Sequence, residues 1–133
     1  MGFLNSWQPR LLSVLRIVAG LAFLEHGLVK FFHFPISMGS GPLPPLMQAA
    51  GALELVGGAL LVLGLFTQPV AFVLSGEMAV AYWMFHAPSG PYPIANMGEP
   101  ALLYCFTFLY LASAGGGSIG LDAILGRKRG LEA

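Results

Sequence analysis

The sequence predicts an all-α integral membrane protein, a bundle of four antiparallel transmembrane helices with both termini in the cytoplasm. Of its 133 residues, 56% are hydrophobic and only 9% are charged, whereas a soluble domain carries about 25% charged residues. So few charged side chains cannot cover a surface that faces water. The second observation is that apolar runs of helical length alternate with short turns or loops rich in proline and glycine. Together they predict a single membrane domain over residues 1–133.

The first apolar run predicts a helix over about residues 11–34. A short amphipathic segment precedes it, in which Trp7 and Arg10 are typical of an anchor at the membrane interface. A secretory signal peptide is the alternative, but its apolar region covers only about 7–15 residues. The run is longer than that, so we expect it to stay in the membrane as the first transmembrane helix.

Three further helices and a basic cytoplasmic tail are expected in the rest of the chain. The helices cover about residues 46–66, 69–86 and 99–114, and the tail covers residues 115–133. A helix of about 20 residues crosses a hydrocarbon core of ~30 Å. Only the short turn Thr67-Gln68-Pro69 joins the second and third helices, so these two must be antiparallel. The consecutive glycines Gly115 to Gly117 favour the end of the fourth helix.

The distribution of basic residues predicts the orientation. Arg10 lies beside the first helix, and Arg127, Lys128 and Arg129 lie in the tail, whereas the two loops rich in proline and glycine contain no lysine or arginine. Cytoplasmic segments of membrane proteins carry the excess of lysine and arginine. Both termini are therefore expected in the cytoplasm and both loops on the outer side.

Ionisable residues gather at one depth on three of the helices. Glu25 and His26 belong to the first helix, Glu54 to the second and Glu77 to the third. At ~1.5 Å per residue, each glutamate lies ~12–14 Å from the outer end of its helix. Ionisable residues at such depth are rare and usually functional. We therefore predict a polar chamber in the outer half of the bundle, with these four residues as catalytic proton donors or ligand contacts.

A second set of residues is predicted to surround the chamber and to contact a cofactor. It consists of Lys30, Trp83, His86, Glu99 and Tyr104. Structural explanations exist beside the functional one. Lys30 can extend toward the interface, Glu99 complements the dipole at a helix start, and a lone buried glutamate can simply fasten two helices. The matched depth of Glu25, Glu54 and Glu77 favours a site for these three acids, whereas capping alone is sufficient to explain Glu99 and the explanation for Lys30 stays open.

A quinone suits such a chamber better than a metal. A di-iron bundle needs Glu-x-x-His on two helices, and neither Glu25 nor Glu77 is followed by histidine at that spacing, so no metal site is predicted. Reduction of a quinone takes up protons as well as electrons, which requires carboxyl or imidazole groups beside apolar walls. The chain has no evident electron carrier, so a soluble or membrane redox partner must bring the electrons.

Other partners are disfavoured by composition. Six basic residues balance six acidic ones, so the chain has no basic field that would attract nucleic acid. Cys105 stands alone, which excludes a pair of thiols within the chain. The sequence leaves a homo-oligomer open.

Several segments together resemble the DoxX family. They are Glu25-His26-Gly27-x-x-Lys30-Phe31-Phe32, Leu53-Glu54-x-x-Gly57-Gly58, Gly76-Glu77-Met78-x-x-Ala81-Tyr82, Asn96-x-Gly98-Glu99-x-Ala101-x-x-Tyr104 and a glycine-rich segment ending in Leu121-Asp122. The resemblance implies a four-helix, multi-pass protein of a bacterial or archaeal plasma (inner) membrane, in contact with membrane lipid. Some members of that family are subunits of thiosulfate:quinone oxidoreductase, and others are linked to thiol or quinone stress. One departure is Gly120, which stands where the family often has serine.

Three functions remain open at this point. The first is a quinone-interacting subunit of an oxidoreductase, with ubiquinone or menaquinone as the ligand. The second is a membrane scaffold without enzymatic activity that recruits soluble redox enzymes. The third is a small transporter, which is disfavoured because neither an inverted repeat nor a broken helix is evident.

Overall fold

A computed structural model describes residues 1–132 and the side chains up to Lys128. The described chain is helical throughout and contains no β-strand. Its elements are α1 (Gly2–Asn5), α2 (Gln8–Phe32), α3 (Pro45–Leu63), α4 (Thr67–Ala81), a π-helix (Tyr82–His86), a 3-10 turn (Ala87–Ser89), α5 (Pro93–Asn96), α6 (Glu99–Ala114) and α7 (Leu121–Glu132). The all-helical prediction is confirmed.

Three helical stretches are long and apolar enough to cross a membrane. They are Gln8–Phe32, Pro45–Leu63 and Thr67–Ser89, the last combining α4 with the π-helix and the 3-10 turn. The helix α6 is apolar as well but has only 16 residues. Length and composition therefore identify three spans and leave α6 as a shorter apolar helix.

The helix bounds differ from the predicted ones for local reasons. The helix α2 begins at Gln8, before the expected residue 11, because Pro9 fits the first turn, where its missing N–H leaves no hydrogen bond unmade. It ends at Phe32 because His33 takes a left-handed conformation with φ of 51°. In α3 the end comes at Leu63 because Gly64 takes φ of 68°.

The third predicted helix begins at Thr67, slightly before the expected residue 69, and its α-helical part ends at Ala81. Its last five residues, Tyr82–His86, form a π-helix. The tail 115–133 is not simply a basic extension, because it contains α7. The sequence did not predict α5 or α7.

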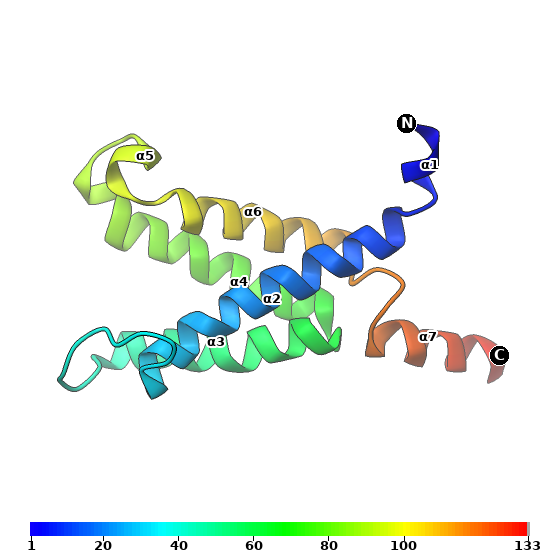
Figure 1. The fold of residues 1–133 in the computed structure, drawn as a ribbon, viewed down its shortest axis with the longest axis horizontal. Helices are drawn as coiled ribbons and strands as arrows, with labels where there is room; N and C mark the ends of the chain where they lie inside the picture. The colour runs from blue at the N-terminus through cyan, green and yellow to red at the C-terminus, as the bar shows by residue number, and fades with distance from the viewer. Residues whose placement is uncertain (133) are drawn as a thin grey trace.

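The bundle is built from two antiparallel pairs of helices, α2 with α3 and α4 with α6 (Figure 1). The two pairs cross and diverge toward the end that carries the loops 33–44 and 87–98, which we call the loop end. Both termini lie at the opposite end, which we call the terminal end. Contacts between α2 and α6 are few, so the pairs leave space between them toward the loop end.

Glycines allow α2 and α3 to approach closely. A Cβ atom at Gly27 would lie 2.8 Å from the backbone nitrogen of Leu55, and one at Gly58 would lie 2.8 Å from that of Leu24. Contacts this short leave no room for a side chain, so the two backbones pack directly against each other. On α3, Gly51 and Gly58 therefore face α2, whereas Gly57 faces Leu74 of α4.

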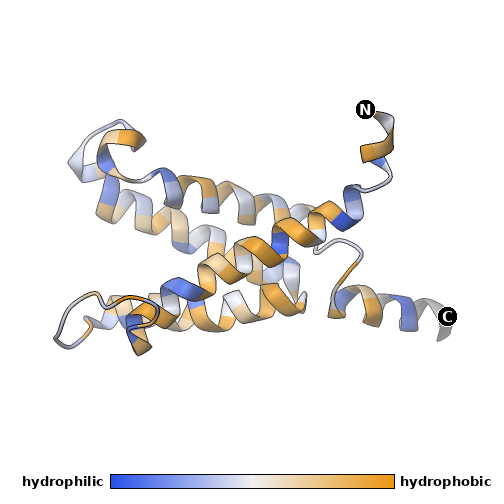
Figure 2. Cartoon of the chain, in the orientation of Figure 1, coloured by the Kyte–Doolittle hydropathy of each residue, from blue (hydrophilic) through white to orange (hydrophobic). Residues whose placement is uncertain are grey.

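An apolar core closes the middle of the bundle, while the outer faces expose apolar side chains. Phe23, Leu61 and Phe108 have no exposed surface, and the rings of Phe23 and Phe108 meet edge to face at 4.9 Å. On the outside, residues such as Phe72 are largely exposed, and the hydrophobic colour of Figure 2 runs along much of the long helices. Exposed apolar surface of this extent is expected of helices that face lipid.

The glycine-rich segment after α6 folds back over the terminal end. The backbone N–H of Ile119 donates to Ser13 Oγ at 3.0 Å. The Asp122 carboxylate accepts the backbone N–H groups of Phe66 and Thr67, both at 2.9 Å. Asp122 therefore caps the start of α4, although the two segments are far apart in the sequence. The tail thereby ties α2, α4 and α7 together.

Candidate functional site

The candidate site is built around an ion pair between α2 and α3. Lys30 Nζ lies 2.7 Å from both carboxylate oxygens of Glu54. The side chains are only 13% and 4% exposed, respectively. A lysine on a helix points back toward the helix N-terminus, so Lys30 reaches from the loop end down to the deeper Glu54. Gly51 leaves room for it, since a Cβ there would lie 3.2 Å from Lys30 Cδ.

The ion pair was not anticipated from the sequence. Lys30 was expected to surround the chamber and Glu54 to lie in it, and no pairing of the two was predicted. The pair could have been predicted because Lys30 and Glu54 lie on adjacent antiparallel helices. The flexible lysine stem spans the difference in depth between them.

Glu77 on α4 supplies the second carboxyl group of the site. Both of its carboxyl oxygens are shielded from solvent, and neither has a hydrogen-bond partner among the described residues. Buried polar groups are normally hydrogen-bonded, and an exception in a native structure needs an explanation. Glu77 is therefore free to form a hydrogen bond with a bound ligand.

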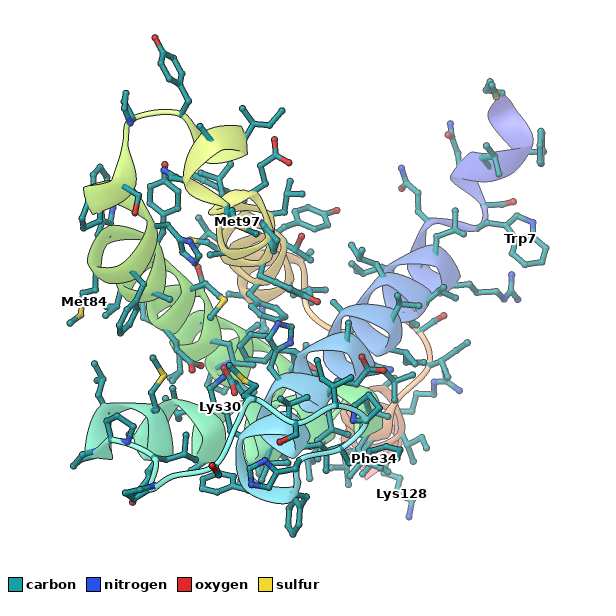
Figure 3. The ribbon with its side chains drawn as sticks, turned by 60° about the vertical axis from the view of Figure 1, so that its left-hand side comes forward. Trp7, Lys30, Phe34, Met84, Met97 and Lys128 are labelled. Carbon is teal, nitrogen blue, oxygen red and sulfur yellow. The ribbon has the colours of Figure 1, made fainter. Side chains whose placement is uncertain are left out.

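A cavity of about 650 Å³ brings these groups together, a size within the range of small-molecule sites, which is about 300–1,000 Å³. Its ionisable and phenolic lining residues are His26, Lys30, Glu54, Glu77, His86 and Tyr104. The remaining walls are mainly apolar and include Leu53, Val73, Met78, Val80, Phe85 and Ala101. In Figure 3, Lys30 lies between α2 and α3, whereas Met84 points away from the bundle. The arrangement is an apolar cavity with a few convergent polar groups.

Three of the predicted residues do not line this cavity. Glu25 is exposed on α2, Trp83 is 71% exposed, and Glu99 lines a separate groove between α2 and α6. Glu25 has the expected depth but the wrong face, because it lies two residues, about 200° around the helix, from the inward-facing Phe23. The structure therefore brings two of the three membrane glutamates into the cavity.

The two histidines of the cavity are oriented by backbone carbonyl groups. His26 Nδ1 lies 3.0 Å from the carbonyl oxygen of Ala22, and His86 Nδ1 lies 3.1 Å from that of Asn96. A carbonyl oxygen only accepts, so each Nδ1 carries the hydrogen, and the neutral ring keeps its Nε2 as an acceptor. Each histidine can therefore accept a proton or a hydrogen bond at Nε2.

Asn96 is a positioning residue that the sequence interpretation did not assign. It is 5% exposed, its Nδ2 donates to the carbonyl oxygen of Gly90 at 2.9 Å, and its Oδ1 accepts the N–H of Gly98 at 2.8 Å. These bonds hold the loop whose carbonyl orients His86. The π-helix that ends at His86 is a feature frequent at functional sites.

Aromatic rings close the cavity toward the apolar core. Tyr104 contacts His26 edge to face, with ring centres 5.9 Å apart, and stacks on Phe108 at 5.6 Å. Phe23 completes this cluster, 5.4 Å from Tyr104. Among the described side chains, no group of three or more histidine, cysteine, aspartate or glutamate residues is arranged to hold a metal ion.

Comparisons with known proteins identify relatives over nearly the whole chain. The family model described as DoxX matches residues 11–87. An uncharacterized protein of Haemophilus influenzae is 48% identical, over 92% of this chain and 96% of its own length. A Bacillus subtilis protein named "Putative oxidoreductase CatD" is 30% identical, over 88% of this chain and 90% of its own length. No solved structure matches the chain significantly.

Proposed function

This chain belongs to the DoxX family of membrane proteins, and from that premise we propose that it is a quinone-interacting subunit of a membrane oxidoreductase system. The head group of a ubiquinone or menaquinone occupies the cavity between α3 and α4. One observation carries the proposal: the unpartnered carboxyl group of Glu77 shares an apolar cavity with the Lys30–Glu54 ion pair. The name of the Bacillus subtilis relative is consistent with an oxidoreductase system.

The polar groups of the cavity suit a quinone and its reduced form. Lys30 carries three N–H donors and contacts the two oxygens of Glu54, which leaves an N–H for a ligand oxygen. Glu77 can hold a proton and give it to that oxygen, or accept a hydrogen bond from a ligand hydroxyl. A quinone takes up electrons and protons together when it is reduced, and Lys30 and Glu77 supply the protons.

The groove between α2 and α6 suits the apolar tail of such a ligand. Its volume is about 410 Å³, its walls include Leu15, Val18 and Leu103, and it shares Pro100 and Tyr104 with the cavity. A tail can therefore leave the cavity beside Tyr104 and run between the two helical pairs. This path opens toward lipid, which is where membrane quinones reside.

The proposal includes a topology. The helix α6 packs along α4 and completes the bundle as a fourth span, with the bilayer adjusting to its shorter length. The exposed Arg10, Arg127 and Lys128 lie at the terminal end, so both termini face the cytoplasm of a bacterial plasma membrane. In this proposal the electrons come from a redox partner protein.

The test is quinone binding to the purified protein in lipid nanodiscs. We expect saturable binding of short-chain ubiquinone or menaquinone, weakened about 10-fold by Glu77→Gln, which corresponds to ~1.4 kcal/mol. Glu25→Gln is the matched control, because this glutamate lies at a similar depth outside the cavity. Absence of binding to the wild-type protein overturns the proposal and favours the scaffold function.

A further inference from the structure

A second cavity lies at the loop end, beside Lys30 of the ion pair. Its volume is about 520 Å³, and its lining includes Lys30, His33, Met38, Leu43 and Gln48. Residues 39–42 of its wall are exposed to solvent. We call this space the vestibule, because its wall is formed by the solvent-facing loop.

The vestibule and the ligand cavity meet at Lys30. Three residues line both spaces: Lys30, Met38 and Met47. Lys30 is the charged one of the three, and it holds Glu54 through two hydrogen bonds of 2.7 Å. The ion pair therefore forms a polar partition between water at the loop end and the apolar cavity beside it.

In the opposite direction the cavity ends against packed apolar side chains. Phe23, Leu61 and Phe108 have no exposed surface, and Leu74 is 1% exposed. A further cavity at the terminal end, lined by residues of α2, α6 and the glycine-rich segment, shares no lining residue with the ligand cavity. The side chains named here that close this end of the cavity are therefore apolar.

We propose that the Lys30–Glu54 ion pair exchanges protons between water in the vestibule and the ligand cavity, so that the site communicates with the loop side of the membrane alone. A proton passes from Lys30 Nζ to a base in the cavity, and a hydronium ion in the vestibule returns a proton to Nζ and leaves as water. This inference rests on the proposed function in taking the cavity as the ligand site. The titratable groups around Lys30 are His26 and His33 near it on the chain, Glu54 on α3, Glu77 on α4, His86 on the π-helix and Tyr104 on α6.

Cysteine labelling measures which side reaches the site. In a Cys105→Ser background, we would introduce Met47→Cys at the shared wall, Ala81→Cys in the ligand cavity and Leu74→Cys in the core. A membrane-impermeant methanethiosulfonate is applied to proteoliposomes of known orientation, from either side. We expect Met47→Cys to react from the loop side and Leu74→Cys from neither. Reaction of Met47→Cys from the terminal side, or from neither side, overturns the inference.

A second measurement tests whether the ion pair limits access from the vestibule to the ligand cavity. Ala81→Cys should react slowly from the loop side and at least 10-fold faster when Lys30→Ala opens the partition, whereas Lys128→Ala should leave the rate unchanged. An unchanged rate in Lys30→Ala overturns this role. If that variant does not fold, Glu54→Gln, which removes the carboxylate and nearly preserves side-chain volume, replaces it with the same expectation.

Labelling in the presence of quinone distinguishes this inference from the proposed function. Short-chain ubiquinone should slow the labelling of Ala81→Cys if the cavity is the quinone site. Labelling from the loop side that quinone does not affect would contradict the proposed function and leave the loop-side access standing.

Discussion

Lys30 on α2 and Glu54 on α3 form a bidentate ion pair, with both oxygens 2.7 Å from Nζ, in a place where neither side chain is more than 13% exposed. The pair joins two helices whose backbones already touch through glycines. Lys30 also lines both the vestibule and the ligand cavity. One contact thus contributes both to the fold and to the candidate site.

Breaking this pair on one side should destabilise the bundle. Lys30→Met leaves the Glu54 carboxylate buried without a cation, which costs ~3–5 kcal/mol in soluble proteins. The double variant Lys30→Met/Glu54→Leu removes both charges and should recover most of the loss. Unfolding by a denaturing detergent in mixed micelles measures these free energies, with Glu25→Gln as the neutral control. If Lys30→Met is as stable as wild type, the pair does not hold the helices together.

The close approach of α2 and α3 predicts a strong effect of side-chain size at Gly27. Gly27→Val should cost ~1–3 kcal/mol of unfolding free energy, because a Cβ atom would press on the backbone of α3. Gly76→Ala is the matched control, since no atom outside the local helix lies within 4 Å of a Cβ there. That substitution should stabilise α4 by up to ~1 kcal/mol. Equal effects of the two changes would contradict the observed packing.

The helices were predictable because apolar runs and breakers are local signals. Counting residues predicted a shared depth for Glu25, Glu54 and Glu77, and two of the three, Glu54 and Glu77, line the candidate cavity. Predicting which residues of a helix face inward requires knowledge of how the helices pack against one another. For Glu25 the sequence did not indicate this, because the chain is so uniformly apolar. Without a polar face to mark the outside of a lipid-exposed helix, the inward face carries little signal.

The closure of the terminal end was beyond sequence prediction for a different reason. Its contacts use backbone groups: the N–H of Asp122 donates to the carbonyl oxygen of Gly64 at 2.8 Å, and the N–H of Ile119 donates to Ser13. Backbone donors are present in every residue and identify no partner. Asp122, with its side chain capping α4, carried a chemical signal, but the capped residues lie 55 and 56 positions away.

Asp122 predicts a specific dependence of stability on pH. Burial opposes its charge, but the N–H groups of Thr67 and Phe66 and the positive charge of Arg16 outweigh that effect and lower the pKa of Asp122 below its ordinary value of 3.8. A lowered folded-state pKa means that the stabilisation is complete well above pH 3.8 and is lost as the pH falls through the folded-state value.

The variant Asp122→Asn isolates this contribution. It should be less stable than wild type by ~1 kcal/mol at neutral pH, because asparagine keeps one of the two acceptor oxygens and loses the other, which is about the net worth of one hydrogen bond. The difference should shrink as the pH falls below 3.8. Unfolding curves of both proteins over an acid series measure it, with Glu99→Gln as the control for a general charge effect. A difference that is constant with pH would exclude ionisation of Asp122 as its cause.

The departure from the family pattern at Gly120 gives the last prediction. Arg16 is 1% exposed, and its Nε and Nη1 have no hydrogen-bond partner among the described residues. Gly120 has φ of 151°, and a Cβ there would press on Arg16 Nη1. Gly120→Ala should therefore cost ~1–3 kcal/mol from backbone strain. Gly120→Ser should lose less, because its hydroxyl can accept a hydrogen bond from the unpartnered guanidinium. Introducing Arg16→Met into both variants should abolish the difference between serine and alanine in unfolding free energy, and a difference that persists without Arg16 would refute the contact.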